Sequence, residues 1–141
     1  MINARSETAC TKPAFRDALK SRRCLIPADA FYEWQRIGKS KQPYCFEVNE
    51  GELFAFAGIW NRWKNARGNA VENCSILTTT PNTVTAAVHD LMPVILDLDS
   101  YDLWLDPVSG CGFRFGTVET PQCSDDAVLS RKYSDQPGRE R

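Results

Sequence analysis

The chain contains 141 residues, and this length predicts a single domain, because domains usually have roughly 100–200 residues. Hydrophobic residues make up 43% of it, but no apolar run approaches the ~20 residues of a membrane helix or forms a secretory signal, so a cytoplasmic protein is expected. The formal net charge is −1, yet residues 1–42 carry nine Lys and Arg against four Asp and Glu, which fits either an anionic partner or a solvated helix face.

The first predicted elements are a short helix and a long extended segment. In TKPAFRDALKSR, Thr11 can cap a helix and Pro13 suits its first turn. Phe15 and Leu19 add an apolar pair four residues apart, so a helix is predicted. CLIPADAFYEW is predicted to be extended with an interruption at Pro27, and QRIGKSKQP to form a charged turn after it.

Three more strands are predicted in the middle of the chain, in YCFEV, LFAFAGIW and CSILTTT. NEG is predicted to join the first two as a tight hairpin, and KNARGNAVEN to form a longer, exposed loop. A turn capped by Asn82 then leads to a strand, PVIL, and to a short helix in DLDSYDLWLD.

This succession of elements predicts an α+β fold. About five strands with short helices attached, rather than alternating strand–helix units, favour a mixed, largely antiparallel, curved or barrel-like sheet. We expect residues 1–106 to form this domain, as an incomplete version of it. Residues 107–141 have few apolar runs and are expected to be a poorly ordered tail, with the last dozen residues disordered.

The cysteines are scattered and argue against a metal site. No C-x-x-C pair occurs, and His89 is the only histidine, so neither a metal nor a cofactor is expected. Three cysteines lie in apolar, strand-like runs and are predicted to be reduced core residues. The six are Cys10, Cys24, Cys45, Cys74, Cys111 and Cys123, and those in apolar runs are Cys24, Cys45 and Cys74.

The stretch ADAFYEW places a carboxylate among large aromatic residues. On a strand, Phe31 and Glu33 share one face while Tyr32 and Trp34 share the other. Glu33 could simply reach water at a strand end. Alternatively, it is an active-site acid or base whose pKa its aromatic neighbours help to raise.

Four stretches in this order, NARSET, CLIPADAFYEW, SILTTTPN and VHDLMPVIL, resemble the SOS response-associated peptidase family, also called abasic-site processing proteins. The resemblance covers residues 1 to about 106. It implies a protein of the DNA damage response that binds single-stranded DNA and links itself covalently to abasic sites. In the family, a cysteine exposed by removal of the initiator Met attacks the open sugar aldehyde through its α-amine and thiol, which gives a thiazolidine ring.

The resemblance also implies roles for particular residues. Glu33 would serve as the acid and base that imine formation requires. His89 would hydrogen-bond the opened sugar or share the proton transfer, and Asn3 would orient the amine. The resemblance also implies that Arg5 contacts a DNA phosphate and that Trp34 contacts bases, and it places Thr78 at a position that holds DNA.

Both ends of the sequence depart from the family pattern. The family begins with a Met-Cys-Gly-Arg type start, whereas residue 2 here is Ile, so we expect this chain to lack the segment that carries the nucleophile. Every cysteine in the sequence has its amine in a peptide bond. After Pro107 the strand and polar loop that complete the family fold are also missing from the pattern.

Four functional hypotheses follow. The first is an abasic-site processing enzyme of lyase type, and the second a non-catalytic binder of single-stranded DNA that uses Arg22, Arg23 and Trp34 beside Arg5. The third is a thiol peptidase that pairs a cysteine with His89. The fourth is a truncated product that folds poorly. A monomer without membrane or metal partners is expected.

Overall fold

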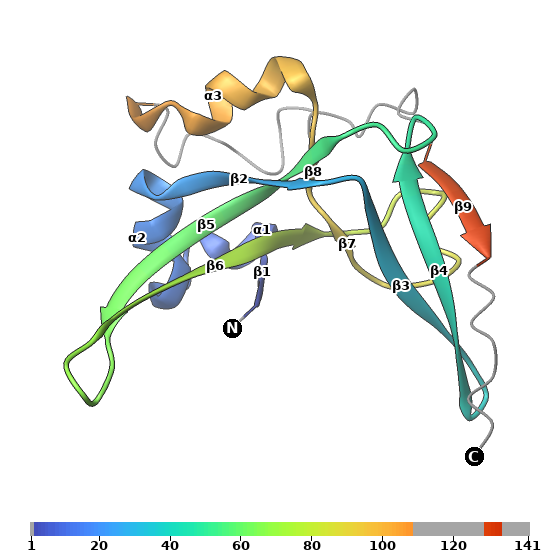
Figure 1. Ribbon diagram of the computed structural model, residues 1–141, viewed down its shortest axis with the longest axis horizontal. Helices are drawn as coiled ribbons and strands as arrows, with labels where there is room; N and C mark the ends of the chain where they lie inside the picture. The colour runs from blue at the N-terminus through green and yellow to red at the C-terminus, as the bar shows by residue number, and fades with distance from the viewer. Residues whose placement is uncertain (1, 109–128, 134–141) are drawn as a thin grey trace.

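Two β-sheets joined at an angle make up the computed structural model of the protein, which describes residues 2–108 and 129–133 (Figure 1). The larger sheet has the order β1-β6-β5-β2, with β7 paired to β6 and β8 paired to β5. All its pairs are antiparallel except β1 with β6. Its strands are β1 (Asn3–Arg5), β2 (Arg23–Ala28), β5 (Phe54–Lys64), β6 (Ala70–Thr79), β7 (Met92–Pro93) and β8 (Ile95–Leu96).

The smaller sheet is antiparallel, with the order β3-β4-β9. It consists of β3 (Ala30–Ile37), β4 (Ser40–Val48) and β9 (Leu129–Tyr133), while the helices are α1 (Ser6–Ala9), α2 (Pro13–Ser21), the 3-10 turn η1 (Leu98–Ser100) and α3 (Tyr101–Leu105). The α+β class and the largely antiparallel, curved sheet with short helices are therefore confirmed. None of the helices in residues 2–108 is long and apolar enough to span a membrane.

Each face of the larger sheet has its own core. On one face the helices pack against the sheet, around the fully buried Trp104 of α3 and Leu77 of β6. On the other face the smaller sheet packs, and Phe31 stacks on Phe46 with ring centroids 5.1 Å apart and meets Phe56 edge to face. Since β2 leads directly into β3, the chain passes from the first sheet to the second at Asp29 (Figure 1).

One predicted hairpin is wrong. The NEG stretch does not pair the strands it joins, because β4 pairs with β3 and β9 whereas β5 pairs with β2, β6 and β8. Asn49, Glu50 and Gly51 have φ angles of 44°, 63° and 100°. Three successive left-handed residues thus turn the chain from the smaller sheet into the larger one.

Smaller boundaries also differ from the predictions. The extended segment breaks at Asp29, while Pro27 lies inside β2, an edge strand on which the missing N–H is tolerated. Lys12 rather than Thr11 is the N-cap of α2, although Pro13 does begin the helix as predicted. The exposed loop is shorter than predicted, because β5 and β6 pair until only residues 65–69 remain between them.

The three cysteines predicted to lie in the core differ in burial. Cys45 is buried and Cys24 partly buried, but Cys74 is exposed, so the prediction is wrong for Cys74. Its neighbour Ser75 is the buried residue, because successive side chains of β6 point to opposite faces. All three are free thiols.

The tail after residue 107 contributes one strand, β9, which pairs with β4. No strand is predicted there from the sequence. Residues 109–128 and 134–141 lie outside the described part of the chain, and with them Cys111, Cys123 and most of the predicted disorder.

Candidate active site

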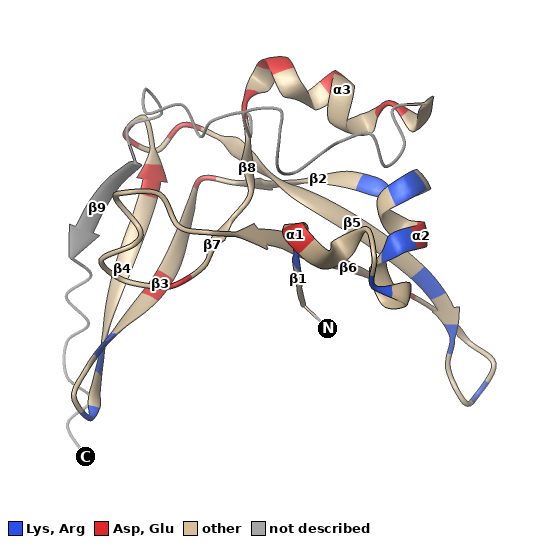
Figure 2. Ribbon diagram, turned by 180° about the vertical axis from the view of Figure 1, so that it is seen from behind, with Lys and Arg blue, Asp and Glu red and all other residues tan. Residues whose placement is uncertain are grey.

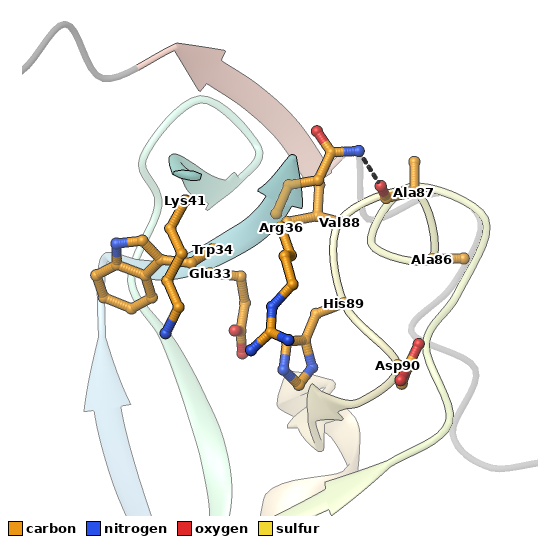
Figure 3. A pocket seen from close by; sticks show the side chains of 10 residues that line it. Glu33, Trp34, Arg36, Lys41, Ala86, Ala87, Val88, His89 and Asp90 are labelled. Carbon is orange, nitrogen blue, oxygen red and sulfur yellow. Dashed lines mark hydrogen bonds between the residues drawn. The ribbon is translucent and has the colours of Figure 1, made fainter. Parts of the chain in front are cut away.

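An open pocket of about 710 Å³ lies between the hairpin of β3 and β4 and the segment that precedes β7 (Figure 3). Its walls come from two parts of the chain that are far apart in sequence. The lining residues are Glu33, Trp34, Gln35, Arg36, Lys41, Ala86, Ala87, Val88, His89 and Asp90. Two residues that the sequence analysis singles out for proton transfer, Glu33 and His89, therefore share one pocket.

Glu33 lies in the middle of β3, directly opposite Tyr44 of β4. The predicted alternation holds: Phe31 is buried, whereas Trp34 is 50% exposed on the other face. Partial burial raises the pKa of the Glu33 carboxyl above its ordinary value. The nearby His89 ring and the backbone N–H of Trp34 lower that pKa in part, and both effects are smaller than that of burial.

His89 is held by a compact turn. The side-chain oxygen of Asn82 accepts hydrogen bonds from the backbone N–H groups of Val84 and Thr85, at 3.1 and 3.0 Å, and so caps the turn as predicted. The N–H of His89 then donates to the carbonyl oxygen of Thr85 at 3.0 Å. Since Thr85 and the adjacent Val88 are buried, the turn is anchored and its exposed imidazole is presented to the pocket.

The backbone of Leu91 orients the imidazole. Nδ1 of His89 lies 3.1 Å from the N–H nitrogen of Leu91 and 3.2 Å from its carbonyl oxygen. A neutral ring can accept from the N–H, and a charged ring can donate to the carbonyl, so Nδ1 keeps a partner in either state. Nε2 is left for a ligand in the pocket.

Gln35 ties the two walls of the pocket together. Its side-chain nitrogen donates to the carbonyl oxygen of Ala87 at 2.6 Å, the bond drawn as a dashed line in Figure 3. Its side-chain oxygen accepts a hydrogen bond from the hydroxyl of Tyr44 at 2.9 Å. The segment carrying His89 is thereby fixed against the strand carrying Glu33.

The arrangement suits proton transfer to and from a bound molecule. A carboxyl whose pKa is raised can carry a proton to a leaving oxygen and afterwards take one from an attacking group. An imidazole beside it can hydrogen-bond the same oxygen. Because His89 is exposed, the pair is open to a macromolecular ligand rather than enclosed around a small one.

Of the other residues implied by the resemblance, Trp34 lines the pocket, whereas Asn3, Arg5 and Thr78 lie outside its lining. Asn3 and Arg5 are exposed on β1 and lie opposite Ile76 and Thr78 of β6. Ile76 packs partly against the core between the two sheets, so this face of β1 is the one toward the smaller sheet. Thr78 is 6% exposed, and its side chain offers little surface to a ligand.

Three polar pocket residues of the β3–β4 hairpin, Gln35, Arg36 and Lys41, were not predicted from the sequence. They fall in QRIGKSKQP, which was predicted to be a turn. The strands instead continue to Ile37 and resume at Ser40, so only two residues form the turn. The alternation of AFYEW, extended by three residues, was the signal that could have found Gln35 and Arg36.

Arg23 is not a surface cation for DNA, in contrast to the second hypothesis above. Its side chain is 9% exposed, donates to the carbonyl oxygens of Trp104 and Leu19 at 2.5 and 3.1 Å, and also donates to that of Asp106. Its guanidinium carbon lies 5.5 Å from the centre of the Trp104 ring. Arg23 therefore joins β2 to α3.

No cysteine belongs to the pocket lining, so residues 2–108 contain no thiol paired with His89 there. In the same part of the chain, no three side chains of His, Cys, Asp or Glu cluster in a way that could hold a metal ion. The pocket therefore offers acid–base chemistry from carboxyl and imidazole groups.

The structure is that of a mixed α+β protein with a curved sheet and an open pocket lined by Glu33 and His89, and comparison with known proteins agrees on one family. The model of the SOS response associated peptidase (SRAP) family matches residues 1–113. Two proteins of Bacillus subtilis (strain 168) are similar: abasic site processing protein YoqW is 48% identical over 108 residues, and YoaM is 44% identical over 127. These matches cover 76% and 89% of this chain, and 48% and 56% of the relatives.

A crystal structure of a Bacteroides thetaiotaomicron protein superposes with a TM-score of 0.77 at 30% identity, over 93% of this chain and 57% of that one. The chain belongs to the SRAP family, whose curated members named above are abasic site processing proteins. It spans about half the length of these relatives.

Proposed function

We propose that this chain binds single-stranded DNA and supplies the acid–base part of a site that captures abasic sites covalently during the DNA damage response. The observation that carries the proposal is the shared pocket of Glu33 and His89 in a member of this family. The raised pKa of the Glu33 carboxyl is the property that a proton donor needs near neutral pH.

The captured group would be the open-chain aldehyde of an abasic deoxyribose. An amine attacks the aldehyde carbon, a C–N bond forms, and the carbonyl oxygen becomes a hydroxyl. Loss of that hydroxyl as water, with loss of the nitrogen proton, leaves an imine. In our proposal Glu33 protonates the departing hydroxyl and its carboxylate then accepts the proton from nitrogen, while Nε2 of His89 hydrogen-bonds the sugar oxygen.

The nucleophile implied by the family resemblance is a cysteine with a free α-amine. Residue 2 is Ile, and all six cysteines of residues 1–141 have their amines in peptide bonds. An internal thiol such as that of Cys10 could form only a reversible hemithioacetal. The proposal accordingly assigns to residues 1–141 the proton-transfer residues and a DNA surface, and does not assign the amine to them.

The test compares the chain as printed with a form extended at its N-terminus by a family-type segment beginning Met-Cys-Gly-Arg. Each is incubated with a single-stranded oligonucleotide containing one abasic site, and cross-linked product is measured on a denaturing gel. We expect product from the extended form alone. Glu33→Gln in that form should slow product formation about 100-fold, whereas Glu50→Gln, an exposed carboxyl of the NEG turn, should not change it.

Equal rates for Glu33→Gln and the unchanged extended form would overturn the assigned role. Asn3→Ala belongs in the same series, because the resemblance places Asn3 beside the amine. If Asn3→Ala abolishes the cross-linked product and Glu33→Gln does not, the proton-transfer role belongs to residues on β1 and not to the pocket.

A second function to be distinguished is non-catalytic binding of single-stranded DNA by residues 1–141, in which every cysteine has its amine in a peptide bond. The two functions differ in what the chain as printed does with abasic DNA. Retardation on a native gel without product on a denaturing gel supports binding alone. Product from the printed chain would instead show that an internal group captures the sugar.

A further inference from the structure

We propose that Arg36 and Lys41 form a clamp for the DNA backbone at the mouth of the Glu33–His89 pocket, so that the pocket selects a sugar carried between phosphodiesters. The inference rests on the proposed function and deepens it. Neither residue is among those that the family resemblance implies. Both line the pocket, one from each strand of the β3–β4 hairpin.

The first observation is their pairing. Arg36 lies directly opposite Lys41 in the register of β3 and β4. Two like charges opposite each other on neighbouring strands destabilise a sheet. An anion bound between them would remove that repulsion, and a phosphodiester carries one negative charge for each nucleotide.

The second observation is that both cations are available. Neither Arg36 nor Lys41 takes part in an ion pair within residues 2–108, in contrast to Arg16 with Asp17 and Arg62 with Glu72. Both side chains are exposed. Figure 3 shows the Arg36 and Lys41 side chains among the pocket residues, with Lys41 extending past Trp34.

The third observation concerns the neighbours of this pair. A pocket containing the Glu33 carboxyl would by itself repel a phosphate, and two cations at its mouth offset that repulsion. Trp34, which is 50% exposed beside them, offers a flat face for a base. Cations that follow a backbone next to an aromatic stacking face are the usual combination in proteins that bind single strands.

The molecule has a second basic region at its opposite end, which makes a matched control. Figure 2 shows Lys and Arg at the β3–β4 hairpin and, far from it, on α2 and the β5–β6 hairpin. Lys64 and Arg67 of that second hairpin are exposed and lie outside the pocket lining. Charges on β3 could also serve to keep an edge strand from pairing with other chains, and that role predicts no effect on DNA binding.

The test measures binding to a 15-nucleotide single strand with a central tetrahydrofuran, an abasic analogue that has no aldehyde. Affinity is followed by fluorescence anisotropy between 50 and 200 mM KCl for the wild-type chain, Arg36→Gln/Lys41→Gln and Lys64→Gln/Arg67→Gln. Each phosphate contact to a single strand contributes about 0.7 to the slope of log affinity against log salt. The clamp holds one phosphate between its two cations, so its loss should reduce the slope by about 0.7, and the wild type should lose about 2.6-fold more affinity than the variant over this range.

The control variant should keep the wild-type slope, and the charge-conserving Arg36→Lys/Lys41→Arg variant should restore it. Thermal unfolding checks that each variant is folded; a charge-conserving variant that is folded but has the reduced slope counts against the clamp. An unchanged slope in Arg36→Gln/Lys41→Gln, or an equal reduction in both double variants, would overturn the clamp. The analogue cannot react, so this binding test does not depend on cross-linking. If the N-terminally extended form fails to cross-link abasic DNA while the clamp variant still has the reduced salt slope, the covalent function is refuted and the clamp is supported.

Discussion

The side-chain nitrogen of Gln35 lies 2.6 Å from the carbonyl oxygen of Ala87, and this hydrogen bond joins the strand of Glu33 to the turn of His89. The two residues are 52 positions apart in sequence. The bond therefore closes a long loop at the site where the carboxyl and the imidazole meet.

Replacing Gln35 by Leu should loosen the pocket more than the fold. Loss of its hydrogen bond to Ala87 is expected to lower the free energy of unfolding by about 1 kcal/mol. The amides of residues 86–90 should exchange with solvent faster, as measured by hydrogen–deuterium exchange. Gln42→Leu, which removes only a local bond to Pro43, is the control and should leave that exchange unchanged.

Glu33→Gln should make the chain more stable at neutral pH. The folded-state pKa of Glu33 lies above the ordinary value of 4.5, so ionisation costs stability as the pH rises through the interval between them. The free energy of unfolding of the variant minus that of the wild type should thus grow from about pH 4.5 upward and level off above the raised pKa. Urea unfolding from pH 3.5 to 8 measures it, with Glu50→Gln as control; a difference that shrinks with rising pH would contradict the sign.

His89→Ala should move the pKa of Glu33 further upward. The imidazole charge lowers that pKa in the wild type, and its removal leaves the effect of burial less opposed. The carboxyl carbon of Glu33, followed by NMR across the same pH range, reports its titration directly. A midpoint that stays in place would mean that the two groups do not interact.

Gly58 of β5 should tolerate no larger residue without a change in Ile26. A Cβ built there would lie 2.7 Å from Cδ1 of Ile26 and 2.9 Å from Sγ of Cys24. Gly58→Val is therefore expected to cost about 1–3 kcal/mol of unfolding free energy. In a double-mutant cycle, Ile26→Ala should recover part of that loss; strictly additive effects would show that the two sites do not touch.

Arg23→Gln should unfold the protein more readily without altering the surface charge that DNA meets. The guanidinium donates to backbone carbonyls of Leu19, Trp104 and Asp106, and hydrogen bonds from a charged group are worth about 1.5–3 kcal/mol each. A loss of about 3 kcal/mol is expected, against less than about 0.5 kcal/mol for the exposed Lys20→Gln. Chemical denaturation of both variants measures these losses.

Local pattern in the sequence was enough to determine the elements and part of the site. The alternation of AFYEW sets Phe31 in the core and Trp34 outside, and the Pro13 start with its apolar pair sets α2. The repeat with which side chains point to one face depends only on the backbone conformation of the segment itself. It can therefore be recognised without knowing which other segments pack against it. The order of the four motifs was likewise sufficient to indicate the family that the comparisons confirm.

Only the tertiary structure decided which strands pair and which side chains meet. NEG resembles a hairpin turn, yet β4 and β5 enter different sheets, because β4 pairs with β3 and β9 while β5 packs among β2, β6 and β8. Arg23 looks like a surface cation until α3 covers it, and Arg36 reaches the pocket only because the turn before β7 docks on β3. These outcomes depend on contacts between segments that are distant in sequence. The free energies of such contacts cannot be inferred from a short stretch of residues.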